Sequence, residues 1–157
     1  MKIFGIDPGY GRLGVAIVEK DNRGINSLIY SGCLETDARE DIYERFSLVG
    51  KEVVRILEKH KPENVAIESL FLAKNQKTAM RVAEIRGIII YEAIRKGLPV
   101  FEYTPLQIKT AITGDGTSDK NRIIKMVNLL IKIDKKILLD DEYDAMAVAL
   151  THSAYQK

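Results

Sequence analysis

The feature that most constrains the fold of this chain is the order of its apolar segments. Three short apolar runs come first, at residues 2–6, 13–19 and 25–34, and only brief Gly-rich or polar turns separate them. Such short connections are typical of antiparallel neighbours, because a parallel connection needs a dozen or more residues. From residue 42 onward, apolar positions recur at helical spacing, and short strand-like runs interrupt them. We therefore expect three antiparallel strands followed by alternating helices and strands.

The remaining elements follow from apolar spacing and from Gly and Pro punctuation. The expected helices are residues 42–60, 76–96 and 105–113, one around 123–130 and one from about 141, and the expected strands are residues 65–67 and 100–103. This order predicts an α/β fold, with one mixed five-stranded sheet and helices on both faces. A chain of 157 residues has the size of one domain, so we expect residues 1–157 to form a single domain.

Four carboxylates occupy positions where such a fold would bring them to one point. Asp7 ends the first apolar run, and Glu68 ends the run before the second long helix. Asp141 and Asp144 are three residues apart, so they share one side of the expected last helix. An acid at the end of a buried strand is costly unless it pairs or binds a cation. The pattern predicts a magnesium site, and sites of this kind cut or join phosphodiesters.

A simpler interpretation exists for the helix acids. Asp140, Asp141 and Glu142 begin the expected helix, where acidic residues cap the backbone and complement the helix dipole. Glu68 considered alone is equally ambiguous. The joint pattern favours a metal site, in which two ions about 4 Å apart activate water and stabilise the leaving oxygen.

The charge distribution is consistent with a polyanionic substrate. The whole chain has a formal net charge of +2, yet residues 71–136 hold 13 Lys or Arg and only 6 Asp or Glu. A basic middle around an acidic centre suits a nucleic acid held over a metal site, although solvated helix faces give a similar pattern.

Cysteine content and hydropathy bear on the compartment. One cysteine, Cys33, excludes an internal disulfide and favours the reducing cytoplasm. No apolar run approaches the roughly 20 residues of a membrane span, and the first residues lack the layout of a signal peptide. We expect a cytoplasmic protein without a membrane partner.

Four motifs together resemble those of the RuvC family of Holliday junction resolvases, or crossover junction endodeoxyribonucleases, in the ribonuclease H-like superfamily. The motifs are residues 5–9, residues 66–68 with 71–75, residues 99–103 with 107–109 and 114–116, and residues 141–147. The resemblance covers essentially the whole chain and implies the ribonuclease H-like fold.

The resemblance also implies an activity. Members of this family are homodimers that bind a four-way DNA junction and nick two strands symmetrically, leaving 5′-phosphate and 3′-hydroxyl ends. By motif, Asp7, Glu68, Asp141 and Asp144 are the implied catalytic residues and metal ligands. They would hold two Mg²⁺ ions per site, for which Mn²⁺ can substitute. The implied partners are the RuvA and RuvB branch-migration proteins of recombinational DNA repair.

Five further residues are candidates for DNA contacts. Phe71 lies close to Lys74 and Lys77, and an aromatic side chain among cations can stack on an unpaired base. The resemblance implies that Phe71 is a wedge at the crossover, whereas the alternative is a core Phe at a strand end. Lys109 and Lys120 match lysines that the family uses near the cleaved strand, where they would neutralise phosphate charge.

Three arginines are weaker candidates for contacts with the DNA backbone, namely Arg81, Arg86 and Arg122. The expected helix over residues 76–96 carries Gly87 and the apolar run 88–90, which is more apolar surface than one packed face needs. This helix is a candidate dimer surface, unless both of its faces are buried in the monomer.

Three other functions are compatible with parts of the sequence. A ribonuclease H-type enzyme for RNA–DNA hybrids would use the same four acids. A non-catalytic junction-binding scaffold would not need them. A strand followed by a Gly-rich turn also resembles the phosphate loop of actin-like ATPases and sugar kinases, but those proteins need a much longer chain.

Overall fold

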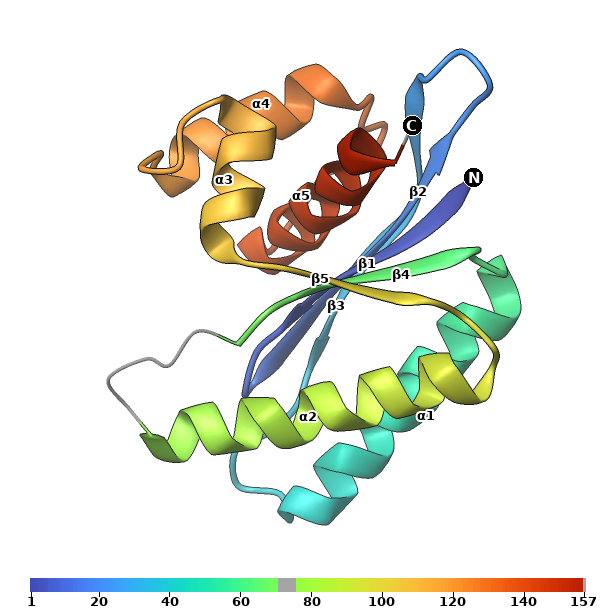
Figure 1. Cartoon of the computed structure of the whole chain (residues 1–157). Helices are drawn as coiled ribbons and strands as arrows, with labels where there is room; N and C mark the ends of the chain where they lie inside the picture. The colour runs from blue at the N-terminus through green and yellow to red at the C-terminus, as the bar shows by residue number, and fades with distance from the viewer. Residues whose placement is uncertain (71–75, 157) are drawn as a thin grey trace.

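The computed structural model of this protein describes residues 1–70 and 76–156, apart from the side chains of residues 76 and 77. Its strands and helices follow the order expected from the sequence (Figure 1). The elements are β1 (Lys2–Pro8), β2 (Arg12–Lys20), β3 (Asn26–Glu35), α1 (Ile42–His60), β4 (Asn64–Glu68), α2 (Gln76–Arg95), β5 (Val100–Tyr103), α3 (Pro105–Thr113), α4 (Lys120–Leu130) and α5 (Asp140–Tyr155).

The five strands form one mixed sheet in the order β3-β2-β1-β4-β5. β1, β2 and β3 are antiparallel neighbours, whereas β4 and β5 are parallel to β1. The predicted fold class is therefore confirmed. The prediction that the first strand ends at Ile6 is wrong by two residues, because Asp7 still pairs with Gly14 and Pro8 with Leu13.

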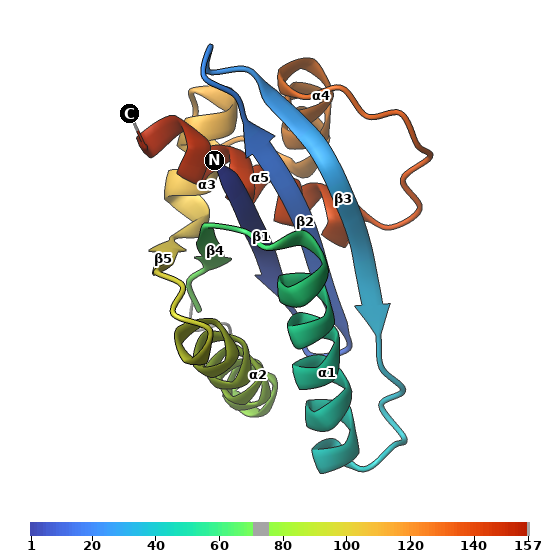
Figure 2. The ribbon, with the colours of Figure 1, turned by 90° about the vertical axis from the view of Figure 1, so that its right-hand side faces the viewer.

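Helices cover both faces of the sheet. In Figure 1, α1 and α2 lie below the sheet and α3, α4 and α5 lie above it, and Figure 2 shows the same layers from the side. Alternate strand residues point to opposite faces, so each strand contributes to two cores. Phe4 and Ile6 pack in the core under α1 and α2, and Ile3 packs in the core under α5.

α5 is the most buried helix among the described elements. Every residue from Ala145 to Ser153 is buried, because the sheet lies on one side of this helix and α3 and α4 lie on the other. No helix in the described part of the chain combines the length and the apolar character needed to cross a membrane.

Candidate active site

Two of the predicted acids lie side by side at one edge of the sheet. β1 and β4 are parallel, and their register places Ile6 beside Ile67, so Asp7 and Glu68 follow on adjacent strands. Their carboxyl groups share a hydrogen bond. The fold thus brings together two acids that are far apart in the sequence.

A third acid reaches the same place from the helical layer. Asp144 of α5 lines a pocket of about 230 Å³ together with Asp7 and Glu68. Two predicted cations, Lys109 of α3 and Lys120 of α4, line this pocket as well. The rest of its lining is apolar: Pro105, Ile108, Ile123 and Ala147. Five of the nine residues predicted from the sequence therefore converge on one concave surface.

Asp141 lies beside this pocket rather than in its lining. Its Oδ2 atom is 3.6 Å from the Nη1 atom of Arg12, and Arg12 also pairs with Glu35 at 3.4 Å. The charge of Asp141 still acts on Asp7, whose pKa it raises. Sequence reasoning missed Arg12, because an Arg after a Gly-rich turn gives no signal of its own.

Glycines allow α5 to lie close enough for its short Asp side chains to reach the sheet. A Cβ atom placed at Gly14 would lie 2.1 Å from the carbonyl oxygen of Asp141, and one at Gly5 would lie 2.3 Å from that of Ala145. No side chain tolerates such distances, so the backbones of β1, β2 and α5 are in direct contact. Small residues of α5, Ala145 and Ala149, therefore meet Gly5 of β1.

The simpler interpretation of the first α5 residues holds only in part: Asp140, Asp141 and Glu142 lie in the first turn, where they complement the helix dipole, but none of them is the N-cap. The N-cap residue is Leu139, which makes no side-chain capping bond. Glu142 is buried, and its Oε2 atom accepts hydrogen bonds from Ser31 Oγ at 2.7 Å and from Lys135 Nζ at 2.6 Å. This bridge ties the start of α5 to β3 and to the segment before the helix.

The pocket holds negative charge in a poorly solvated place. Burial, together with the charges of Glu68 and Asp144, raises the pKa of Asp7 to about 8. Burial also raises the pKa of Glu68 and of Asp144. A carboxyl group with such a shifted pKa is stabilised by a nearby cation, since opposite charge favours the ionised form.

Lys120 supplies one such cation directly. Its Nζ atom lies 3.0 Å from Asp144 Oδ2 and 3.4 Å from Asp140 Oδ2. Partial burial disfavours the ammonium group, but the hydrogen bond and charge of Asp144 outweigh this effect and raise the pKa of Lys120. Lys120 thus links the acidic pocket to the surface of α4.

The donor set fits a hard divalent cation, although the side chains are not closed around one. Within residues 1–70 and 76–156, no three His, Cys, Asp or Glu side chains are arranged to hold a metal ion. Two of the acids have cationic side chains as partners instead: Asp144 pairs with Lys120, and Asp141 pairs with Arg12. Magnesium needs only a few carboxylates because it keeps several of its waters.

Other predicted DNA contacts have different outcomes. Phe71 and Lys74 lie outside the described residues, and for Lys77 only the backbone position in the first turn of α2 is described. The suggestion that Arg86 contacts a phosphate is wrong. Arg86 is only 7% exposed and hydrogen-bonds to the carbonyl oxygen of Glu68 and, at 2.5 Å, to Glu102 Oε2.

The two other arginines are at the surface but already have acidic partners. Arg81 pairs with Glu84 at 2.8 Å, and Arg122 pairs with Asp115 at 3.2 Å. Exposed pairs of this kind are weak and exchange readily with other anions, so both arginines remain candidates.

A mixed sheet with this strand order, carrying acids from β1, β4 and α5 in one pocket, defines a nuclease of the ribonuclease H-like class. A family model described as "Crossover junction endodeoxyribonuclease RuvC" matches residues 3–152. This chain belongs to the RuvC family.

Individual relatives agree with this assignment. The crossover junction endodeoxyribonuclease RuvC of Thermosipho melanesiensis is 46% identical over 149 residues, which are 95% of this chain and 94% of the relative. The solved structure of Thermus thermophilus RuvC in complex with a Holliday junction substrate superposes with a TM-score of 0.92 at 30% identity, over 99% of this chain and 94% of that one. The yeast mitochondrial Holliday junction resolvase Ydc2 shares the fold, with a TM-score of 0.73 at 14% identity over 98% of this chain and 78% of that one.

Proposed function

We propose that this protein resolves Holliday junctions as a magnesium-dependent endonuclease, making paired symmetric nicks that leave 5′-phosphate and 3′-hydroxyl ends. The observation that carries the proposal is the convergence of Asp7, Glu68 and Asp144 with Lys109 and Lys120 in one pocket. Membership of the RuvC family supports the choice of substrate over an RNA–DNA hybrid.

Asp7, Glu68, Asp141 and Asp144 are the proposed catalytic residues, and they would hold two Mg²⁺ ions per site, with Mn²⁺ as a substitute. When bound, these ions would lower the pKa of the attacking water and neutralise charge on the scissile phosphate. Asp7 is the fixed point, because it lies in the central strand of the sheet and lines the pocket with Glu68 and Asp144. A phosphate that enters the pocket would replace Asp144 as the partner of Lys120, and Lys109 faces it from α3.

The direct test is cleavage of a synthetic four-way DNA junction with Mg²⁺ and with chelator, beside a linear duplex and an RNA–DNA hybrid. We expect paired nicks in the junction alone, and only with Mg²⁺. Junction binding without cuts would contradict the nuclease assignment and favour a scaffold. Cleavage of the hybrid alone would keep the acidic site and overturn the proposed substrate.

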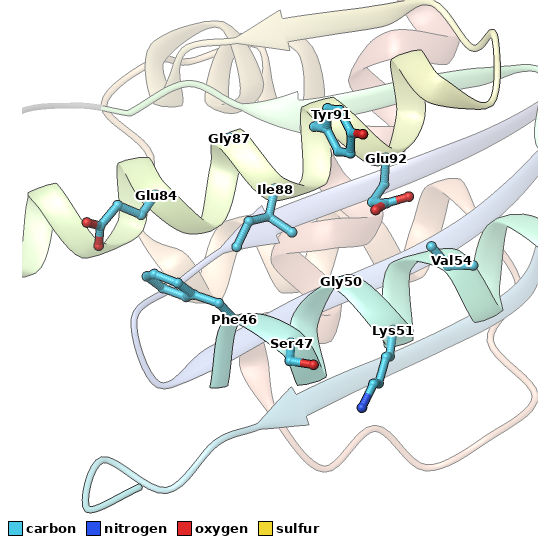
Figure 3. Close-up of a pocket in the computed structure, with 10 residues that line it drawn as sticks. All are labelled: Phe46, Ser47, Gly50, Lys51, Val54, Glu84, Gly87, Ile88, Tyr91 and Glu92. Carbon is cyan, nitrogen blue, oxygen red and sulfur yellow. The ribbon is translucent and has the colours of Figure 1, made fainter. Parts of the chain in front are cut away.

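We further propose a homodimer, with a second copy seated on the outer face of α1 and α2. A groove of about 800 Å³ between these helices is lined mainly by apolar atoms, including those of Phe46, Val54 and Ile88 (Figure 3). Along α2, the exposed Met80, Tyr91 and Ile94 continue this apolar surface at helical spacing. A twofold junction needs two equivalent active sites, and a closed twofold dimer provides them.

The remaining proposals concern the setting of the reaction. Residues 1–157 would act as one nuclease domain in the cytoplasm, with the RuvA and RuvB branch-migration proteins as partners. Phe71 would wedge at the crossover, and Lys74 and Lys77 would hold the flanking phosphates. The basic composition of residues 71–136 supports this placement of the DNA.

A further inference from the structure

Arg86 is a buried cation directly behind the acidic pocket. It lies on α2 next to Ile85 and one helical turn before Ile89. Both of these isoleucines are buried in the core beneath the sheet. The packing of α2 therefore fixes the position of the Arg86 backbone. Its side chain is only 9% exposed, so little of the guanidinium group meets bulk solvent.

Both ends of the guanidinium group are occupied. Nη1 donates to the backbone carbonyl of Glu68, the last residue of β4, and Nη2 donates to Glu102 Oε2 of β5 at 2.5 Å. The sheet register places Ile67 beside Glu102, so Arg86 spans two adjacent strands at the point where β4 ends. One side chain thus joins α2, β4 and β5 behind Glu68.

We propose that Arg86 is a positioning residue that orients Glu68 for divalent metal binding. This inference rests on the proposed metal site, because Glu68 is one of its ligands. Arg86 holds the peptide group of Glu68 itself, so a shift of the guanidinium group displaces the carboxylate. Its positive charge also acts to lower the pKa of Glu68, which favours the ionised carboxylate.

The Arg86→Lys variant separates geometry from charge. Lysine keeps the positive charge, but its single ammonium group cannot reproduce the planar fork that reaches both acceptors. Replacement of a residue that orients a metal ligand typically lowers metal affinity or activity by about 10- to 100-fold. We expect Arg86→Lys to weaken Mn²⁺ binding in this range, and Glu102→Gln to weaken it less in the same direction.

The measurement is Mn²⁺ titration of the purified, metal-free protein, followed by electron paramagnetic resonance of the free ion, with junction affinity measured in chelator. Arg95→Lys is the matched control, because Arg95 lies on the same helix, pairs with Glu92 at 2.5 Å and is half-exposed. We expect junction affinity without metal to be unchanged in all three variants. In Arg86→Lys, the Mg²⁺ concentration that gives half-maximal cutting should rise. The junction concentration that gives half-maximal cutting should rise less.

The possible results distinguish this inference from the proposed metal site. Loss of Mn²⁺ binding in Asp7→Asn together with wild-type binding in Arg86→Lys would overturn the role of Arg86 alone. Wild-type protein that binds no Mn²⁺ would overturn both. Weaker junction binding in chelator, with unchanged Mn²⁺ binding, would assign Arg86 to the DNA and contradict the inference. If Arg86→Lys does not fold, wild-type Mn²⁺ binding in Glu102→Gln would still overturn it.

Discussion

Stability and function make opposite demands on Asp7. Its carboxyl group is partly buried beside two other acids, and both the burial and the neighbouring charges favour the protonated form. A metal ligand must be deprotonated, so binding of a divalent cation at this site has to displace a proton. Ionisation of the Asp7 carboxyl group is therefore unfavourable in the metal-free protein and becomes favourable when a cation binds.

Replacing Asp7 by Asn tests this balance. The amide is nearly isosteric but carries no charge, so we expect cleavage of the four-way junction to be abolished. Junction binding should be unchanged or tighter, because a negative charge is removed from beneath the phosphates. The measurements are junction cleavage and a gel-shift titration in chelator. A variant that cuts at the wild-type rate would contradict the proposed role of Asp7.

The raised pKa of Asp7 also predicts how stability depends on pH. Its ordinary value is 3.8 and its value in the folded, metal-free protein is about 8, so the folded state binds more protons between these limits. The free energy of unfolding should therefore fall as pH rises from about 5 to about 8, at up to roughly 1.4 kcal/mol per unit for one group. Urea unfolding in chelator across this range measures it.

Asp7→Asn is also the control for this pH dependence. Buried His152 has a lowered pKa and contributes in the opposite sense, but it is present in both proteins and cancels in their difference. We expect Asp7→Asn to gain stability over the wild type as pH rises, and added Mg²⁺ to remove that gain. A constant difference from pH 5 to pH 8 would contradict the raised pKa.

At the scale of single elements, the contact of α5 with β1 and β2 determines where two of the acids lie. Gly5 and Gly14 allow this contact, and Gly14 is also the pairing partner of Asp7 in the sheet. The periodicity of the sequence predicted α5 and the shared side of Asp141 and Asp144. It did not predict the role of the two glycines, since a Gly within a strand signals close approach without naming the approaching element.

Gly14→Ala should therefore push α5 away from the sheet. The added methyl group meets the Asp141 carbonyl, and overpacking of this kind typically costs about 1–3 kcal/mol. We expect a lower free energy of unfolding in urea and a lower cleavage rate, because Asp141 and Asp144 move together. Gly11→Ala is the control, as a Cβ there meets no atom within 4 Å among the described residues. Equal stability of the two variants would contradict the proposed contact.

At the scale of the whole molecule, the proposed dimer is tested at Gly87. A Cβ atom at this position meets nothing within 4 Å in the described part of the chain, so Gly87→Arg should leave the monomer folded. The longer side chain would fill the groove between α1 and α2 with charge. We expect sedimentation velocity to show that Gly87→Arg is monomeric. We also expect this variant to make single nicks rather than paired symmetric nicks in the junction. Ile25→Arg, at an exposed turn, is the control and should remain dimeric.

Most of the architecture was predictable, because short turns and apolar periodicity are local signals. The meeting of Asp7 and Glu68 was predictable for the same reason, since acids at the ends of adjacent strands meet at one edge of a sheet. The pairing of Asp141 with Arg12 and the burial of Arg86 were not. Both depend on contacts between elements that are distant in the sequence. Without knowledge of those contacts, a charged residue on a helix is predicted to be exposed.

Because of the strand order, the elements that carry the acids differ in how easily they unfold locally. β1 is the third of five strands, and the stretch directly before Asp7, from Ile3 to Ile6, pairs with a neighbour on each side. We expect the amide hydrogens of this stretch to exchange more slowly than those of the outer elements. Glu68 and the helix acids belong to elements that can fluctuate around this strand. Local fluctuations would thus move Glu68 and the acids of α5 while Asp7 stays in position. The site would then re-form around Asp7 without unfolding of the sheet.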